Sequence, residues 1–224
     1  MNIQKIINKN RKLTNMLLKY IGDENQSIDE YEQLRSFLDQ NQIQQNYEKL
    51  RELLHIILNI SNNHHRNINF FNKIEQIFKF LGNNIKQTFS NSEIYDFFSS
   101  NNSILLLLIK NSIIIIDESI SALIQEENSK GKNFYFFPEI KPFINHSKSD
   151  EIEKEMHESF PNIEDFFRLR KKGENEHYIC ELIRNDSIEE FVKYVNQTNY
   201  SISSTIQYSI FEMNAFLVER KKQH

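Results

Sequence analysis

Histidine, cysteine and carboxylate side chains come nearest in this sequence to a catalytic pattern. His177 precedes Cys180, the single cysteine, by three positions, and on a helix this spacing would bring a Cys–His nucleophile pair together. Nothing beside the pair supplies an oxyanion hole or an orienting acid. A free cysteine on an apolar face usually belongs to the core. The sequence therefore favours a structural Cys180 over a catalytic one.

The histidine and carboxylate groups also lack the partners that their chemistry requires. His64 and His65, with His55 upstream, form the one histidine cluster, and no cysteine or carboxylate stands at zinc-site spacing around it. The carboxylates within 150–155 follow one another along a charged helical stretch, whereas acid–base or glycoside chemistry needs a pair set in an apolar pocket. The chain contains no phosphate-cradling glycine loop. We therefore expect no catalytic residue, no metal site and no cofactor.

The composition limits the fold class and the classes of partner. The chain has 224 residues, of which 39% are hydrophobic, and a formal net charge of −4. Its four Gly and three Pro are too few for β-sandwiches or barrels, which turn about every 8–12 residues. The mild charge predicts no nucleic-acid partner, and the lone cysteine predicts a reducing, intracellular and cytoplasmic location. The longest apolar run, 104–109, is far shorter than the roughly 20 residues of a membrane span, so we expect none.

Apolar residues recur at helical spacing along most of the chain, which predicts an all-α fold of helical hairpins packed as an irregular bundle. The predicted helices cover residues 3–22, 28–38, 43–58, 70–85, 94–98, 104–110, 120–124, 150–158, 162–172, 178–183 and 188–195. Ser90 and Glu93 form a capping-box pattern before the fifth helix. Ile113–Ile116 is β-branched throughout, so a pair of buried strands is the alternative in the region that follows Ile104.

Two segments invite a second interpretation. Residues 133–143 combine five aromatic rings with Pro138 and Pro142, which predicts an ordered, extended loop that covers apolar surface. The first helix carries five basic residues and no acidic one between Met1 and Gly22. A presequence or a membrane-surface helix would share this pattern, but the preference for Lys over Arg and the lack of Ser favour a surface helix packed on the bundle.

A helix–turn–helix pattern occurs twice. Residues 178–195 have the pattern of a short helix, a polar turn and a second helix capped by Asp186 or Ser187. Tyr95–Ile104 aligns with Ile179–Ile188 without a gap. The repeated unit is a helical hairpin of the kind that stacks on its neighbours.

Residues 173–196 and 209–217 resemble the start of the repeat array in large protozoan, trichomonad-type ankyrin-repeat proteins. Residues 70–119 and the segment Phe137-Pro138-Glu139 resemble the N-terminal region of that family. The Thr-Pro-Leu-His signature of regular ankyrin repeats is absent, so 178–195 would be a degenerate unit. The resemblance implies a non-enzymatic protein–protein interaction scaffold. It divides the chain into an N-terminal helical domain, 1–172, and a partial ankyrin-like hairpin with a C-terminal helix, 173–224.

A solenoid unit cannot bury its own apolar face, so an incompletely covered C-terminal edge is expected. An unknown protein partner, or a second copy of the chain, would cover this edge. The candidate edge residues are Tyr194, Tyr200, Ile202, Tyr208, Phe211, Phe216 and Leu217. The alternatives are a truncated or decayed repeat-family member without a binding role of its own, and an enzyme with an unrecognised helical active site. A deep pocket with perturbed titratable groups would favour the enzyme, and a flat or grooved apolar face would favour the scaffold.

Overall fold

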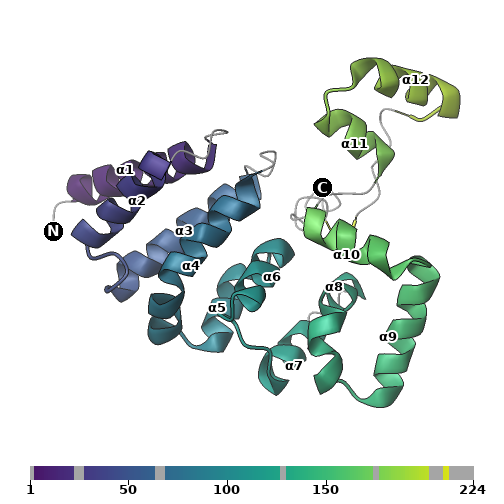
Figure 1. Cartoon of the computed structure of the whole chain (residues 1–224), viewed down its shortest axis with the longest axis horizontal. Helices are drawn as coiled ribbons and strands as arrows, with labels where there is room; N and C mark the ends of the chain where they lie inside the picture. Colours follow the sequence, from purple (N-terminus) through teal and green to yellow (C-terminus); the bar gives the residue numbers. More distant parts are fainter. Residues whose placement is uncertain are drawn as a thin grey trace. The chain divides into compact units, whose positions relative to one another are not determined.

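The computed structural model describes residues 3–22, 28–63, 69–126, 130–173, 177–201 and 209–211. Throughout these ranges the regular secondary structure is helical and contains no β-strand, which confirms the all-α fold class (Figure 1). The chain divides into two compact units, Met1–Ser99 with Leu107–Ile115, and Ser100–Leu106 with Ile116–His224. This division passes through helix α6, Asn102–Lys110, and therefore differs from the boundary at residue 172 that the sequence indicated.

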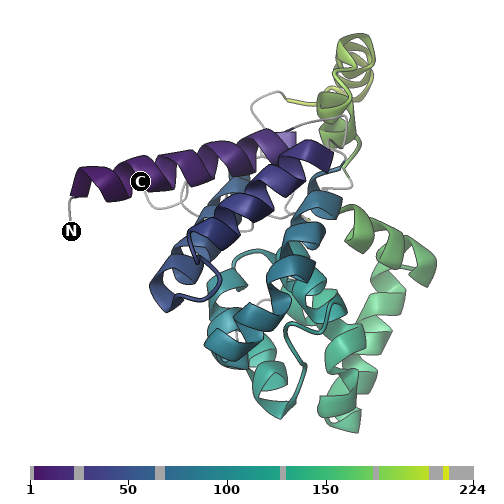
Figure 2. The same ribbon diagram turned by 60° about the vertical axis from the view of Figure 1, so that its left-hand side comes forward.

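The first unit contains the three longest described helices, α1 Ile3–Gly22, α3 Tyr47–Asn63 and α4 Phe70–Thr88. It also contains α2 Ile28–Gln40 and α5 Asn91–Phe98. Helix α1 lies beside α2 and also contacts α3 and α4 (Figures 1 and 2). Leu17 and Ile21 of α1 are buried, so this helix packs on its neighbours through its apolar face. The described part of α1 is the packed surface helix that the sequence favoured.

The capping box at α5 forms as predicted. The Glu93 backbone N–H donates to the Ser90 hydroxyl oxygen, 3.3 Å away, and the Ser90 backbone N–H donates to the Glu93 carboxylate at 2.8 Å. The backbone hydrogen bond from Ser90, together with its side-chain bond, lowers the pKa of Glu93 below its usual value. A short apolar helix thus begins at a residue that local sequence specifies.

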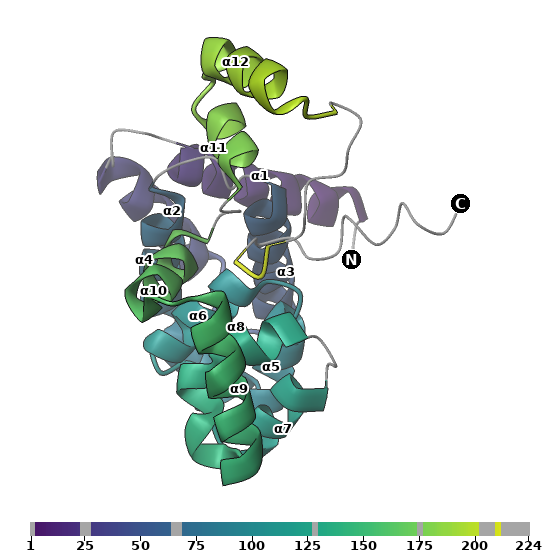
Figure 3. The ribbon, with the colours of Figure 1, turned by 90° about the vertical axis from the view of Figure 1, so that its right-hand side faces the viewer.

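The second unit contains the shorter helices of the C-terminal half. They are α7 Glu118–Glu126, α8 Lys130–Ile140, a 3-10 turn Lys141–Phe143, α9 His146–Ser159, α10 Ile163–Lys172, α11 Tyr178–Arg184 and α12 Ile188–Thr198. Helix α8 contacts α7 and α9 (Figure 3). Helix α10 ends at Gly173, whose φ of 66° is the left-handed C-terminal conformation that glycine adopts without strain.

The aromatic segment 133–143 is helical, so the prediction of an extended loop is wrong. Pro138 lies inside α8 and cannot donate to the carbonyl four residues earlier, which costs a helix about 3 kcal/mol. Tyr135, Phe136 and Ile140 are completely buried on the same helix, and burying such side chains contributes about 1.5–3 kcal/mol each. Burial of the helical face outweighs the proline. Tyr135, Phe136 and Phe137 are buried, as expected for rings that cover apolar surface, whereas Phe143 is 40% exposed.

Helix α6 ends at Lys110 as predicted, and the strand alternative is wrong. Ser112 has a φ of 54°, and its N–H donates to the Ile109 carbonyl at 2.9 Å. The Ile113 N–H donates to the Leu108 carbonyl at 2.9 Å, which completes a Schellman cap. Glycine usually fills this left-handed position, and this glycine-poor chain places polar residues there. The described non-glycine residues with positive φ are Gln42, Ser112, Asp186 and Asn199.

Both predicted helix–turn–helix segments form, and their register differs from that of the gapless alignment. Residues 99–101 connect α5 to α6, and residues 185–187 connect α11 to α12. The second helices begin at Asn102 and Ile188, so these two residues are equivalent. The gapless alignment pairs Ile104 with Ile188 and is therefore out of register by two positions. Ser187 is the N-cap of α12 but makes no side-chain cap hydrogen bond.

Candidate protein interface

Helix α12 is an amphipathic helix whose apolar stripe is only partly covered. Ile188, Phe191, Val192 and Val195 stand at positions i, i+3, i+4 and i+7 of one helix face. All side chains of α12 are described, and none of them is buried. Ile188 is 66% exposed and Val192 is 49% exposed. Ile183 of α11, at 54% exposed, adds a third apolar side chain beside the connecting turn. We call Ile183, Ile188 and Val192 the hairpin patch.

The hairpin patch occupies one side of the α11–α12 pair. With about 100° between successive residues, Tyr178 and Ile183 lie on opposite flanks of α11. On α12 the same rotation per residue places Tyr194 on a different side of the helix from Ile188 and Val192. The rings of Tyr178 and Tyr194 meet at a centroid distance of 5.2 Å, so the two tyrosines lie on one side of the hairpin. The patch therefore lies on the other side, close to the turn.

Carboxylates border the hairpin patch. A surface hollow of about 390 Å³ is lined by Asp186, Ser187, Ile188, Glu189 and Glu190. Glu181 is a further exposed carboxylate on α11, and Lys193 is an exposed cation on α12. The start of α12 therefore combines an exposed apolar side chain with two carboxylates in the first turn and a third, Asp186, just before the helix. This combination suits an apolar ligand surface that carries positive charge.

The predicted tyrosine anchors are only partly available. Tyr194 is half-buried against Tyr178. Tyr200 follows α12, is half-buried, and donates its backbone N–H to the Val195 carbonyl at 3.1 Å. The remaining predicted edge residues other than Phe211 lie outside the described part of the chain: Ile202, Tyr208, Phe216 and Leu217.

Phe211 is a core residue and not part of an uncovered edge. Its side chain is 1% exposed. Its ring lies 5.5 Å from the Phe160 ring and 5.6 Å from the Phe166 ring, centroid to centroid. These contacts join a residue near the C-terminal end of the described chain to the segment before α10 and to α10 itself. They are one physical reason why the second compact unit continues across residue 172.

The groups singled out for chemistry form no metal site in the described residues. His177 is the N-cap residue of α11, and Cys180 is the third residue of that helix. Cys180 is half-buried and not disulfide-bonded. The His55 ring packs edge-on against Phe97 at 4.9 Å. His64 and His65 lie outside the described residues.

The second unit contains a buried ion pair between α8 and α10. Arg170 is 5% exposed, and its guanidinium donates to the Glu139 carboxylate at 2.5 Å. The guanidinium also lies 5.0 Å from the centre of the Tyr135 ring. Burial raises the pKa of Tyr135, whose hydroxyl lies 3.5 Å from that of Ser103. Arg170 and Glu139 are 31 positions apart in the chain, so helical spacing does not predict their pairing.

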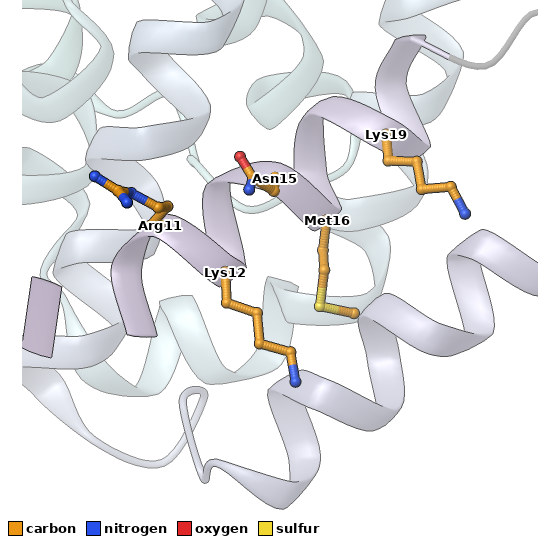
Figure 4. A pocket seen from close by; sticks show the side chains of 5 residues that line it. All are labelled: Arg11, Lys12, Asn15, Met16 and Lys19. Carbon is orange, nitrogen blue, oxygen red and sulfur yellow. The ribbon is translucent and has the colours of Figure 1, made fainter. Parts of the chain in front are cut away.

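The first unit has a buried lysine and an open basic surface. Lys73 is 2% exposed and donates to the Tyr20 carbonyl at 2.6 Å, near the C-terminal end of α1. Exposed Arg11, Lys12 and Lys19 line an open hollow of about 410 Å³ together with Asn15 and Met16. Their cationic groups point in different directions, so they form no converging anion site (Figure 4).

Comparisons with known proteins do not assign the chain to a family: no family model, curated protein or solved structure matches it. Among the described residues, no helix combines the length and the apolarity needed to cross a membrane. The class that the structure defines is an all-α protein of short helical hairpins.

The sequence reasoning missed the patch residues as candidate contacts. It placed Ile183, Ile188 and Val192 on the two helices of the hairpin, but it selected tyrosines and C-terminal residues as anchors. One signal was available. An apolar stripe on an 11-residue helix needs more covering surface than the 7-residue helix that precedes it can provide.

Proposed function

We propose that this chain is a non-enzymatic protein–protein interaction scaffold that binds a protein partner through the α11–α12 hairpin. The observation that carries the proposal is the hairpin patch of Ile183, Ile188 and Val192, whose side chains are about half exposed or more. The ankyrin-like character of the hairpin belongs to the same proposal. So does a reducing intracellular location, which the free Cys180 supports.

Two observations support recognition by shape and apolar contact. Large apolar side chains gathered on one surface mark interaction sites more often than scattered ones do. The surface hollows that described residues line are open to solvent. The hollow at the start of α12, for example, is lined by a few charged and apolar side chains. An exposed apolar face of this kind favours a scaffold over an enzyme.

The experiment is affinity capture from extract of the source cells, with the tagged chain and two matched variants. Ile188→Asp with Val192→Asp places two charges in the patch. Ile28→Asp changes an equally prominent apolar residue of the other unit, 77% exposed at the start of α2. We expect one near-stoichiometric partner with the wild type and with Ile28→Asp, and its loss with the patch variant.

Circular dichroism of all three proteins establishes that helicity is equal. The same partner captured by all three proteins would contradict the proposal, as would the capture of chaperones alone. Phe211 is unsuitable as a capture variant because its ring lies in the core, where a charge would unfold the second unit.

A further inference from the structure

We infer that the hairpin patch recognises an amphipathic helix whose apolar stripe is flanked by lysine or arginine. This inference rests on the proposed function, because it names the chemistry of the partner at the same surface. It comes from the charges around the patch, whereas the proposed function comes from the exposed apolar side chains alone.

The spacing of the patch fits a helical partner. Ile188 and Val192 are one helical turn apart on α12, and Ile183 lies across the turn on α11. Such a ridge matches apolar side chains at positions i, i+3, i+4 and i+7 of a docked helix. Elsewhere in the chain, α1, α3 and α4 bury their apolar stripes against other helices in this way.

The charges specify the sign of the partner. Asp186, Glu189 and Glu190 line the hollow that contains Ile188. Glu189 and Glu190 stand in the first turn of α12, where the helix dipole favours ionised carboxylates. A partner that seats an apolar side chain on Ile188 brings its flanking residues against these three groups. Lysine or arginine there meets opposite charge, and glutamate there meets like charge.

The same charges disfavour a second copy of this chain as the occupant. A two-fold contact between two hairpin patches would place the carboxylates of one copy against those of the other. Repulsion between them opposes the contact, so the inference commits to a different, basic segment.

The test uses two synthetic helical peptides with leucine at positions i, i+3, i+4 and i+7. One carries lysine at the flanking positions, and the other carries glutamate at the same positions. Each is titrated into the isotope-labelled full chain at low salt and followed by NMR. We expect the lysine peptide to shift the amide signals of 178–198, to bind at least about tenfold more tightly than the glutamate peptide, and to weaken as salt is added.

Two variants separate the charge from the apolar contact. Glu189→Lys with Glu190→Lys should reverse the preference between the peptides. Ile188→Ser with Val192→Ser should abolish binding of both. Equal binding of the two peptides, lost in the serine variant, would overturn the charge inference and leave the hairpin as a docking surface.

Other outcomes overturn the inference in distinguishable ways. Signal changes outside 178–198, or none with either peptide, would contradict the assigned partner chemistry, and affinity capture would then decide the proposed function independently. Sedimentation that shows a dimer through the hairpin patch would replace the basic helix with a second copy of the chain.

Discussion

The second helices of the two hairpins, α6 and α12, have opposite relations to solvent. In α6, Ile104, Leu105 and Leu108 are completely buried. In α12, the apolar residues Ile188 and Val192 are 66% and 49% exposed. The same helix–turn–helix pattern therefore occurs once as core and once as surface.

The sequences of the two helices account for part of this difference. From Ile104 to Ile109 every residue of α6 is apolar, and such a helix needs cover on all sides. Helix α12 carries Glu189, Glu190 and Lys193, so it needs cover on one face only. The buried side chains of α6 contribute to the stability of the protein, whereas the exposed Ile188 and Val192 of α12 contribute little to it. Four predictions test the wider contrast between buried and exposed positions of the chain, from the largest expected effect to the smallest.

The largest effect is expected from Phe211→Ala, which tests how far the core extends beyond α12. Removing this ring from between Phe160 and Phe166 should lower the free energy of unfolding by about 3–5 kcal/mol. Phe167→Ala is the matched control, because Phe167 is 48% exposed and should lose far less. Urea denaturation followed by circular dichroism measures both. Equal losses for the two variants would mean that residues 209–211 are not packed in the core.

The second prediction compares the two helices directly. Leu105→Ala leaves a cavity in α6 and should cost about 2–5 kcal/mol of unfolding free energy. Val192→Ala removes exposed atoms from α12 and should change that free energy by less than about 0.5 kcal/mol. Thermal or urea unfolding of each variant provides the measurement. Ordinary surface substitutions change the free energy of unfolding by less than about 0.5 kcal/mol. A loss above about 1 kcal/mol for Val192→Ala would therefore show that the hairpin patch is covered within the chain.

The third prediction concerns the residues at which the two helices begin. Asn101 is buried and its side-chain oxygen accepts the Ile104 N–H at 3.0 Å, so Asn101→Ala should cost about 1–2 kcal/mol. Ser187 holds the corresponding position in α12 without a side-chain cap bond. Ser187→Ala should therefore cost only a few tenths of the unfolding free energy that Asn101→Ala costs. The difference between the two unfolding free energies is the quantity to measure. Similar losses would contradict the difference in capping.

The smallest effect at neutral pH is expected from a buried tyrosine. Tyr20 is 3% exposed, and its hydroxyl donates to the Gln76 side-chain oxygen at 2.5 Å. Tyr20→Phe removes this bond and should cost about 1 kcal/mol. Tyr178 is 48% exposed, so Tyr178→Phe is the control and should cost almost nothing.

The same tyrosine should also make stability depend on alkaline pH. Burial raises the pKa of Tyr20 from 10.0 to about 12. The unfolded chain therefore loses this proton near pH 10, and the folded chain keeps it until about pH 12. The contribution of neutral Tyr20 is complete below pH 10 and is lost as the pH rises towards 12. Unfolding midpoints across this range should fall more steeply for the wild type than for Tyr20→Phe, and parallel curves would contradict the assignment.

Local signals in the sequence located most helices but not their surroundings. The stop at Gly22, the capping box at Ser90 and the end of α6 at Lys110 depend on residues close together in the chain, so pattern and capping rules predict them. The helix through Pro138 does not follow from such local rules. Burial of Tyr135 and Phe136 outweighs the strong helix-breaking signal of the proline. Arg170 and Glu139, which form the buried pair, are 31 positions apart. No local rule relates two residues at that separation.

The candidate interface shows the same division. The apolar stripe of α12 and the carboxylates of its first turn can be read from the sequence, since both follow from helical spacing. The sequence does not tell which residues of the stripe remain exposed, because their burial depends on which other segments of the chain pack against them. The edge predicted from the sequence included Phe211, which the structure places among Phe160 and Phe166. It omitted Ile188 and Val192, which the structure leaves exposed.

The sequence by itself determined the helical class of this protein and the polarity of each helix face. Hydrogen bonds within a helix, its caps and its apolar period all act over a few residues. Only the tertiary structure decided that Phe211 is core, that Arg170 is buried against Glu139, and that Ile188 and Val192 of α12 are exposed. Each of these depends on contacts between residues far apart in the chain, and a face becomes core or interface according to whether another segment covers it.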